Sequence, residues 1–286
     1  MKTSRLALLL LLVIGTLLSG CRSVGTPKVI YLARHGQTAW NRVQRFQGDP
    51  DLDPVGYINR ASLWRLLKKK ELHEIYTSGA KRTQRTAELV AQEKGLKIQA
   101  WPEINEIQAG VFTGFCWAQM EPDKASDGAK KCIVRARGTR PRWTLMALRP
   151  QVAALHSNSM TAKLPLGESY ADLLKRSRPF IDRINGRWSE SSVLIVGHGV
   201  INRVLLHKFV GWSLEQVRKL KQSNDQVYRI ENAGKSNQRI LLYTPGVGWK
   251  VCSKAPQPGD KHLDCDPGPQ TKSAPPPAPP ASAPSK

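Results

Sequence analysis

An arginine and a histidine follow a short apolar run near the start of the chain. Residues 29–33, VIYLA, precede Arg34, His35 and Gly36. A short apolar run bounded by glycine predicts a buried strand that ends at a turn. Ligands of open α/β sheets bind at the carboxyl ends of strands. Neutral imidazole is a nucleophile near neutral pH and guanidinium fits phosphate oxygens, so this strand end predicts a nucleophilic histidine in a phosphate pocket.

A second apolar run ends in the same way. Residues 192–197, SVLIVG, form the strongest buried-strand pattern in the chain, and His198 follows them. If both strands are central and parallel, the imidazoles of His35 and His198 face the same edge of the sheet. One imidazole can then attack phosphorus while the other donates a hydrogen bond to a phosphoryl oxygen.

Two more charged residues are expected at that edge. Arg82 lies in the first turn of a predicted helix, 80–94, which follows a predicted strand at 74–78. Its guanidinium is a second candidate phosphate ligand. Glu106 lies beside a glycine-rich stretch after a third predicted strand, and its carboxyl group is the candidate general acid for a leaving alkoxide.

The elements that must position these residues alternate along the chain. Further helices are predicted at 55–70, 168–188 and 200–210, and further strands at 97–100, 226–230 and 239–244. This alternation predicts a single α/β domain, residues 28–253, with a mostly parallel central sheet flanked by helices. Residues 116–163 lack clean periodicity and are interpreted as an inserted cap, with a candidate helix at 151–158.

Both ends of the chain lie outside the predicted domain. Residues 1–20 have a charged start, an apolar centre and a small-residue end, which is typical of a secretory signal. Residues 18–21, LSGC, resemble a bacterial lipobox, which implies lipidation of Cys21 and a linker at 21–27. An ordinary cleaved signal and an uncleaved anchor are the alternatives. Residues 254–286 are rich in Pro and Ala and predict a disordered tail.

The charge of the chain favours anionic partners. The formal net charge is +22, which suits phosphorylated substrates, nucleic acid or an anionic membrane. The sequence contains no nucleic-acid-binding motif, so we expect a small phosphorylated substrate and a membrane contact through the lipid anchor, without a nucleic-acid partner.

Four cysteines follow Cys21, and an envelope location permits them to form disulfides. Four cysteines allow three pairings, and we expect the sequence-local one, Cys116–Cys132 with Cys252–Cys265. No cysteine or histidine cluster has the spacing of a zinc site, so no metal ligand is predicted.

Five motifs in a fixed order resemble the histidine phosphatase superfamily, whose fold is phosphoglycerate mutase-like. They are RHGQTAWN, SGAKRTQRTA, the glutamate of INEIQAGVFTG, PLGES and VGHG. The resemblance implies His35 as the phosphorylated nucleophile, with a phosphoryl-binding set of Arg34, Asn41, Arg82 and His198. It implies Glu106 as proton donor to the leaving group and then as base for the hydrolytic water. No metal or organic cofactor is implied.

Departures from the mutase pattern favour a phosphatase. Gln37 stands where the mutase branch usually carries glutamate, and residues 107–110 replace an aromatic-bearing segment. We therefore expect a metal-independent phosphomonoesterase, lipid-anchored in the bacterial envelope and facing the periplasm. Arg22 is not the aspartate that resembles an inner-membrane retention signal, which favours the outer membrane. The alternatives are a non-catalytic lipoprotein that binds phosphorylated ligands and a phosphoglycerate mutase-type phosphotransferase.

Overall fold

Two strongly apolar strands, β2 (Val29–Arg34) and β6 (Ser192–Gly197), pair in parallel at the centre of the sheet. All six residues of β6 are buried, and so are the four central residues of β2. Strands that are covered on both faces consist of continuous apolar runs. This burial explains why these two segments have the clearest strand patterns in the sequence.

The computed structural model describes residues 24–116, 160–252 and 254–267, which form one α/β domain. Its eight-stranded sheet has the order β10-β9-β8-β7-β2-β6-β3-β4. The parallel half also contains β3 (Glu74–Thr77) and β4 (Ile98–Ala100). The antiparallel half consists of β7 (Val227–Glu231), β8 (Arg239–Thr244), β9 (Gly248–Val251) and β10 (Asp266–Pro267).

The expected single α/β domain is confirmed, whereas its sheet is mixed rather than mostly parallel. Parallel neighbours require a long crossover connection, usually through a helix. β7, β8 and β9 follow one another through short connections, so each runs antiparallel to the strand before it, and a longer segment returns the chain to pair β10 with β9. The first two of these strands were predicted, whereas β9 and β10 were not.

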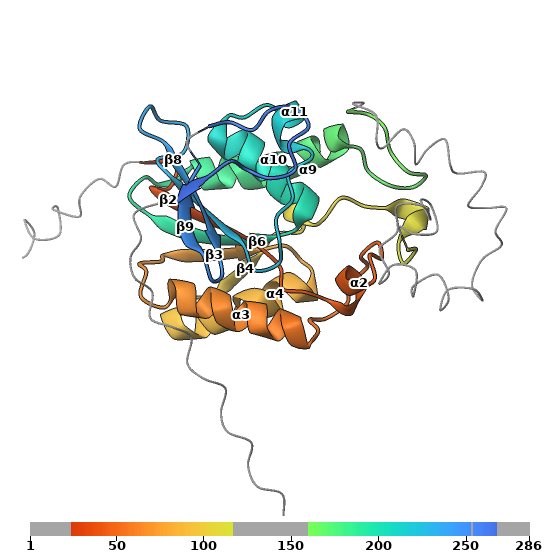
Figure 1. Ribbon diagram of the computed structural model, residues 1–286, viewed down its shortest axis with the longest axis horizontal. Helices are drawn as coiled ribbons and strands as arrows, with labels where there is room; N and C mark the ends of the chain where they lie inside the picture. Colours follow the sequence, from red (N-terminus) through yellow and green to blue (C-terminus); the bar gives the residue numbers. More distant parts are fainter. Residues whose placement is uncertain (1–23, 117–159, 253, 268–286) are drawn as a thin grey trace, which may run out of the picture.

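Helices cover both faces of the sheet, as Figure 1 shows. One face carries α3 (Pro54–Leu67) and α4 (Lys81–Lys94), and the other carries α9 (Tyr170–Asn185) and α10 (Gly199–Val210). Each face has its own cluster of buried apolar side chains. The shorter elements are β1 (Val24–Gly25), α2 (Ala39–Arg42), η1 (Pro102–Ile104), η2 (Gly110–Phe112), β5 (Arg187–Trp188) and α11 (Leu214–Val217). None of the described helices is long and apolar enough to cross a membrane.

Capping residues set the helix starts more sharply than the apolar pattern does. The Asp53 side chain accepts a hydrogen bond from the Gly56 N–H at 2.9 Å, so α3 begins at Pro54. Ser169 and Asp172 form a capping box, so α9 begins at Tyr170 rather than at residue 168.

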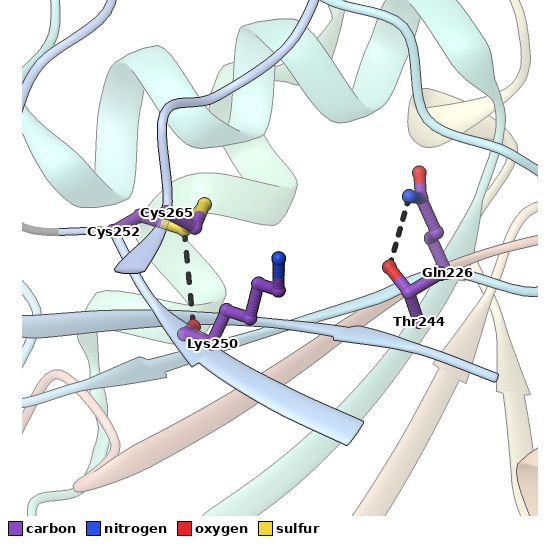
Figure 2. Close-up of a disulfide and its surroundings, with 5 residues drawn as sticks. All are labelled: Gln226, Thr244, Lys250, Cys252 and Cys265. Carbon is purple, nitrogen blue, oxygen red and sulfur yellow. Dashed lines mark hydrogen bonds between the residues drawn. A yellow bond between two sulfur atoms is a disulfide. The ribbon is translucent and has the colours of Figure 1, made fainter. Parts of the chain in front are cut away.

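The described domain extends beyond residue 254, where the disordered tail was expected to start. A disulfide joins Cys252 to Cys265, which is the pairing that the sequence predicts, and β10 pairs with β9. Figure 2 shows this disulfide beside Lys250 of β9. The bond and the strand pair hold this Pro- and Gly-containing segment against the sheet, so composition alone placed the boundary too early.

Several predictions concern residues outside the described part of the chain. Cys116 is disulfide-bonded, but its predicted partner Cys132 lies outside the described residues. The same holds for the signal at 1–20, the lipidation site Cys21, most of the predicted cap, its candidate helix and the tail from residue 268.

Candidate active site

The two predicted imidazoles meet at the carboxyl ends of the central strands. In the β2–β6 register Arg34 lies opposite Gly197, so His35 and His198 follow adjacent strand ends. Their ring centroids are 5.1 Å apart, and the side chains are 1% and 0% exposed. The two histidines therefore meet because two strands far apart in the sequence pair in parallel.

Hydrogen bonding selects one tautomer of His35. Its Nδ1 lies 2.8 Å from the Gly36 carbonyl oxygen, which can only accept, so Nδ1 carries the proton and Nε2 keeps its lone pair. Burial, followed by the charges of Arg34 and Arg82, holds the pKa of His35 well below its usual 6.5. His35 therefore stays neutral and nucleophilic at and below neutral pH.

The backbone around His35 is fixed by three other segments. The Asn224 amide donates to the His35 carbonyl at 2.7 Å, and the Gly36 N–H donates to the Thr86 hydroxyl at 2.8 Å. A Cβ at Gly36 would lie 2.6 Å from the Gly56 carbonyl oxygen, so a larger residue does not fit there. Close packing of the strand end against α3 and α4 thus sets where the imidazole points.

His198 has the opposite tautomer. The Arg82 Nη2 lies 3.1 Å from Nδ1 of His198, and because a guanidinium only donates, Nδ1 must accept. The proton therefore lies on Nε2, which is 2.7 Å from the Ser78 hydroxyl. Burial, and then the Arg82 charge, holds the pKa of His198 well below 6.5. In this arrangement His198 orients Arg82, and a bond from Nδ1 to a phosphoryl oxygen would require the proton to move to Nδ1.

Two buried guanidiniums border the histidine pair. Arg34 donates from Nη1 to the Gln222 carbonyl at 2.8 Å, and Arg82 donates from Nη1 to the Gly48 carbonyl at 2.7 Å. Their Nε–H groups are buried and have no hydrogen-bond partner within the described part of the chain. Burial lowers the pKa of both guanidiniums, while the nearby Glu106 acts in the opposite direction. Unpaired buried donors are costly, so an anion that accepts from them would be stabilised here.

The Glu106 carboxylate lies at the amino end of α10. It accepts from the Val200 N–H at 3.1 Å and from the Ile201 N–H at 3.3 Å, two of the groups that a helix start leaves unpaired. A Cβ at Gly199 would lie 3.6 Å from Oε2 of Glu106 and 3.8 Å from Cζ of Arg34. The predicted proton donor and the phosphate ligand Arg34 therefore both lie beside Gly199, next to His198.

A cleft of about 570 Å³ lies beside this group of residues, and neither His35 nor Arg34 is part of its wall. Arg82, Glu106 and His198 contribute to its wall, and loop residues that the sequence did not single out complete it, among them Asp49, Asn105, Gln108 and Thr113. These residues lie in irregular segments, where no periodicity indicates which side chains face inward.

Asn41 is placed differently from the other predicted ligands. Its Oδ1 accepts from the Thr38 N–H at 3.0 Å and from the Thr38 hydroxyl at 3.1 Å, which completes a capping box at α2. Like Arg34 and His35, Asn41 does not line the cleft, and none of its hydrogen bonds in the described part of the chain reaches the histidine pair. The structure thus brings five of the predicted residues together and gives the sixth a role in holding the loop after His35.

Ser78 is a site residue that sequence reasoning missed. It follows β3 and contacts His198 and, at 2.9 Å, the hydroxyl of Thr83. The sequence could have indicated Ser78, because it is the first residue of the SGAKR segment that contains Arg82.

In residues 24–116, 160–252 and 254–267, no group of three or more His, Cys, Asp or Glu side chains is arranged to hold a metal ion. The cations that border the histidine pair are the two guanidiniums of Arg34 and Arg82. They are the groups that would meet a phosphoryl anion.

Comparison with known proteins identifies the class to which this arrangement belongs. A family model of the histidine phosphatase superfamily (branch 1) matches residues 30–132 and 135–244. The chain therefore belongs to the histidine phosphatase superfamily.

Two relatives illustrate which proteins the chain resembles in sequence. The chain is 30% identical over 198 residues to human 6-phosphofructo-2-kinase/fructose-2,6-bisphosphatase 4, a match that covers 68% of this chain and 36% of that protein. It therefore spans about a third of the length of that relative. It is 26% identical over 205 residues to a probable phosphoglycerate mutase GpmB of Erwinia tasmaniensis, covering 71% of this chain and 84% of that one.

Solved structures share the fold. A mycobacterial glucosyl-3-phosphoglycerate phosphatase superposes with a TM-score of 0.56 at 22% identity, covering 75% of this chain and 96% of that one. A putative alpha-ribazole-5'-P phosphatase of Escherichia coli gives 0.56 at 17% identity, with 83% and 98% covered. Both agree with the mixed sheet and the flanking helices described above.

Proposed function

We propose that this protein hydrolyses a small phosphomonoester through a phosphohistidine at Nε2 of His35, without a metal ion. The observation that carries the proposal is a buried pair of imidazoles bordered by two guanidinium Nε–H groups without partners in the described part of the chain. A tetrahedral phosphoryl group satisfies both donors, and its negative charge offsets the buried positive charge.

The first step transfers the phosphoryl group to the enzyme. The Nε2 lone pair of His35 attacks phosphorus, the bond from phosphorus to the ester oxygen breaks, and the protonated Glu106 gives its proton to the departing alkoxide. Arg34 and Arg82 hold the phosphoryl oxygens, whose charge they stabilise. The products of this step are an alcohol, phosphohistidine and the Glu106 carboxylate.

The second step regenerates the enzyme. The Glu106 carboxylate takes a proton from a water molecule as that water attacks phosphorus, and the bond from phosphorus to Nε2 breaks. Inorganic phosphate leaves, and both His35 and Glu106 return to their starting forms. The hydrogen bonds from Val200 and Ile201 keep the carboxylate in place between the two steps.

We further propose that the enzyme is lipid-anchored at Cys21 in the bacterial envelope and faces the periplasm. The lipobox-like LSGC segment is the basis for this location. The described chain begins at β1, which pairs with β5 shortly before the start of β6, whereas the cleft lies where β6 ends. A tether at Cys21 would therefore attach the domain by the edge opposite the cleft and leave the cleft open to substrate.

A phosphotransferase is the second candidate, because the GpmB relative bears the name of a probable mutase. Both reactions share the first step. They differ in whether water or a second substrate alcohol receives the phosphoryl group from His35. A requirement for a bisphosphorylated activator would support the transferase.

The test is a phosphate-release assay with the purified full chain in detergent and EDTA. The panel contains p-nitrophenyl phosphate, fructose 2,6-bisphosphate, glucosyl-3-phosphoglycerate and simple alkyl phosphates, with His35→Ala in parallel. We expect turnover with EDTA present, and an acid-labile, base-stable phosphoprotein in the wild type. In His35→Ala both should be lost, with a rate at least about 10⁴-fold lower, as expected when a nucleophile is removed.

A folded wild type that binds phosphate but turns over nothing would instead support the non-catalytic binding lipoprotein. Full activity in His35→Ala would remove that residue as the nucleophile. Activity that disappears with EDTA and returns with a divalent cation would overturn the metal-free mechanism.

A further inference from the structure

An ion pair that does not line the cleft holds the loop that carries Glu106. Arg176, in the second turn of α9, bonds to Glu168, two residues before that helix. The Nε–Oε1 distance is 2.7 Å and the Nη2–Oε2 distance is 2.9 Å. The side chains are 21% and 13% exposed. Bidentate guanidinium–carboxylate bonds of this kind are strong and fix the geometry of both partners.

The same guanidinium binds the backbone that leads to Glu106. Arg176 Nη1 donates to the carbonyls of Pro102 and Glu103 at 3.1 and 2.8 Å. Its Nη2 donates to the carbonyls of Asn105 and Glu106 at 3.1 and 3.4 Å. The Pro102 carbonyl also accepts from the Asn105 N–H at 2.9 Å, so the guanidinium adds to the hydrogen bonds that end η1 and extends them to the following residues.

Glu168 holds the chain on the other side of Glu106. Its Oε2 accepts from the Gln108 N–H at 3.0 Å, and its own N–H donates to the Gln108 carbonyl at 2.9 Å. The backbone is therefore tied down both before and after Glu106 by one ion pair. The carboxylate itself is held by α10, so its position depends on two anchors from different elements.

We propose that the Arg176–Glu168 pair positions the proton donor of the reaction. The inference rests on the proposed function, because it gives Glu106 the role of general acid. Neither residue lines the cleft, and their hydrogen bonds to residues 102–108 show that they act through this backbone. Small displacements of a reacting group cost large factors in rate, and a loop freed from both ties would place the carboxyl group less accurately.

The signature of such a role is its dependence on the leaving group. An alkyl phosphate needs a proton at its departing oxygen, whereas p-nitrophenyl phosphate leaves with little help. Loss of the Arg176–Glu168 pair should therefore slow hydrolysis of the alkyl ester more than hydrolysis of the nitrophenyl ester. Phosphate binding should not change, because Arg34 and Arg82 have other anchors.

The experiment compares Arg176→Lys and Glu168→Gln with a matched control, Arg187→Lys, in the full chain. Arg187 forms a bidentate pair with Glu74, with an Nε–Oε2 distance of 2.7 Å and side chains that are 26% and 16% exposed. This pair joins β5 to β3 at the opposite edge of the sheet. The measurements are kcat and KM for both esters, the inhibition constant of inorganic phosphate, and the melting temperature.

For Arg176→Lys and Glu168→Gln we expect kcat for the alkyl ester to fall by about tenfold more than kcat for the nitrophenyl ester. The inhibition constant of phosphate should stay within about twofold of the wild type. Arg187→Lys should lower the melting temperature while keeping the wild-type ratio of the two kcat values. Glu168→Gln keeps the size of the side chain, so it still tests the positioning role if Arg176→Lys does not fold.

Equal losses on both esters, or the same ratio in all three variants, would overturn the positioning role. In that case the wild type would still turn over phosphomonoesters with EDTA present, so the proposed function would survive. A wild type without turnover would overturn both proposals together.

Discussion

The parallel half of the sheet positions the predicted catalytic residues, whereas the antiparallel half supports them. The predicted catalytic side chains follow parallel strands: His35 after β2, His198 after β6, Arg82 after β3 and Glu106 after β4. Parallel strands place all their carboxyl ends at one edge, so residues from four distant segments converge there. Antiparallel strands send alternate ends to opposite edges and do not create such a convergence.

The antiparallel half contributes support instead. The segment before β7 contains Gln222, whose amide donates to the Leu32 carbonyl at 3.0 Å and accepts from Asn202 at 2.7 Å. Its backbone carbonyl receives the bond from Arg34. The far strands carry the Cys252–Cys265 disulfide. Substitutions in the two halves should therefore affect different observables.

After the nucleophile itself, the largest effect should come from a cation in the parallel half. We expect Arg82→Gln to lower kcat/KM by about 10³-fold, because it removes a charge that stabilises the transferring phosphoryl group. The control is Arg60→Gln on α3, since Arg60 also has a buried Nε–H without a described partner and pairs with Glu88 at 2.8 Å. Its kcat/KM should stay within about twofold of the wild type. Similar losses in the two variants would show that any buried arginine matters equally.

The next effect concerns the proton donor. Glu106→Gln should lower kcat for alkyl phosphates by about 10²-fold, because the amide cannot give up a proton to the alkoxide. The loss on p-nitrophenyl phosphate should be smaller, and steady-state rates on both esters measure the difference. If both esters slowed equally, another group would have to serve as the acid.

A third prediction concerns pH. Both histidines have a pKa held well below 6.5 in the folded protein. Below pH 6.5 the unfolded chain takes up a proton at each imidazole and the folded chain does not, so the free energy of unfolding falls as the pH falls. Their contribution is fully present above pH 6.5. Urea unfolding between about pH 5 and 7.5 measures the slope, which should be shallower by one proton in His35→Ala. An unchanged slope would contradict the buried neutral state.

The smallest effect on activity should come from the antiparallel half. Replacing Cys252 and Cys265 by serine removes a cross-link that spans 13 residues. We expect a loss of about 3 kcal/mol in the free energy of unfolding, with kcat/KM changed by less than about twofold at temperatures where the fold persists. Denaturant unfolding and the standard assay measure the two quantities. A large fall in kcat/KM of the folded variant would contradict the idea that the antiparallel half affects stability but not activity.

The sequence alone determined the parts of the site that depend on local pattern. Continuous apolar runs ending in Arg34-His35-Gly36 and in His198-Gly199 indicate central strands and place both imidazoles at strand ends. Arg82 and Glu106 follow from the same logic, because each lies just after a predicted strand. The order of these motifs also predicted the histidine phosphatase superfamily, which the matching family model confirms.

Only the tertiary structure decided what depends on contacts between distant segments. Asn224 lies 189 residues from the His35 carbonyl that it binds, and Arg176 lies 70 residues from Glu106. The capping role of Asn41 is local, but it competes with a ligand role that the motif also allows. The extension of the domain to Pro267 depends on a disulfide and a strand pair rather than on composition. Periodicity reports which side chains face the core, whereas these polar bonds depend on which backbone groups the packed elements leave unpaired.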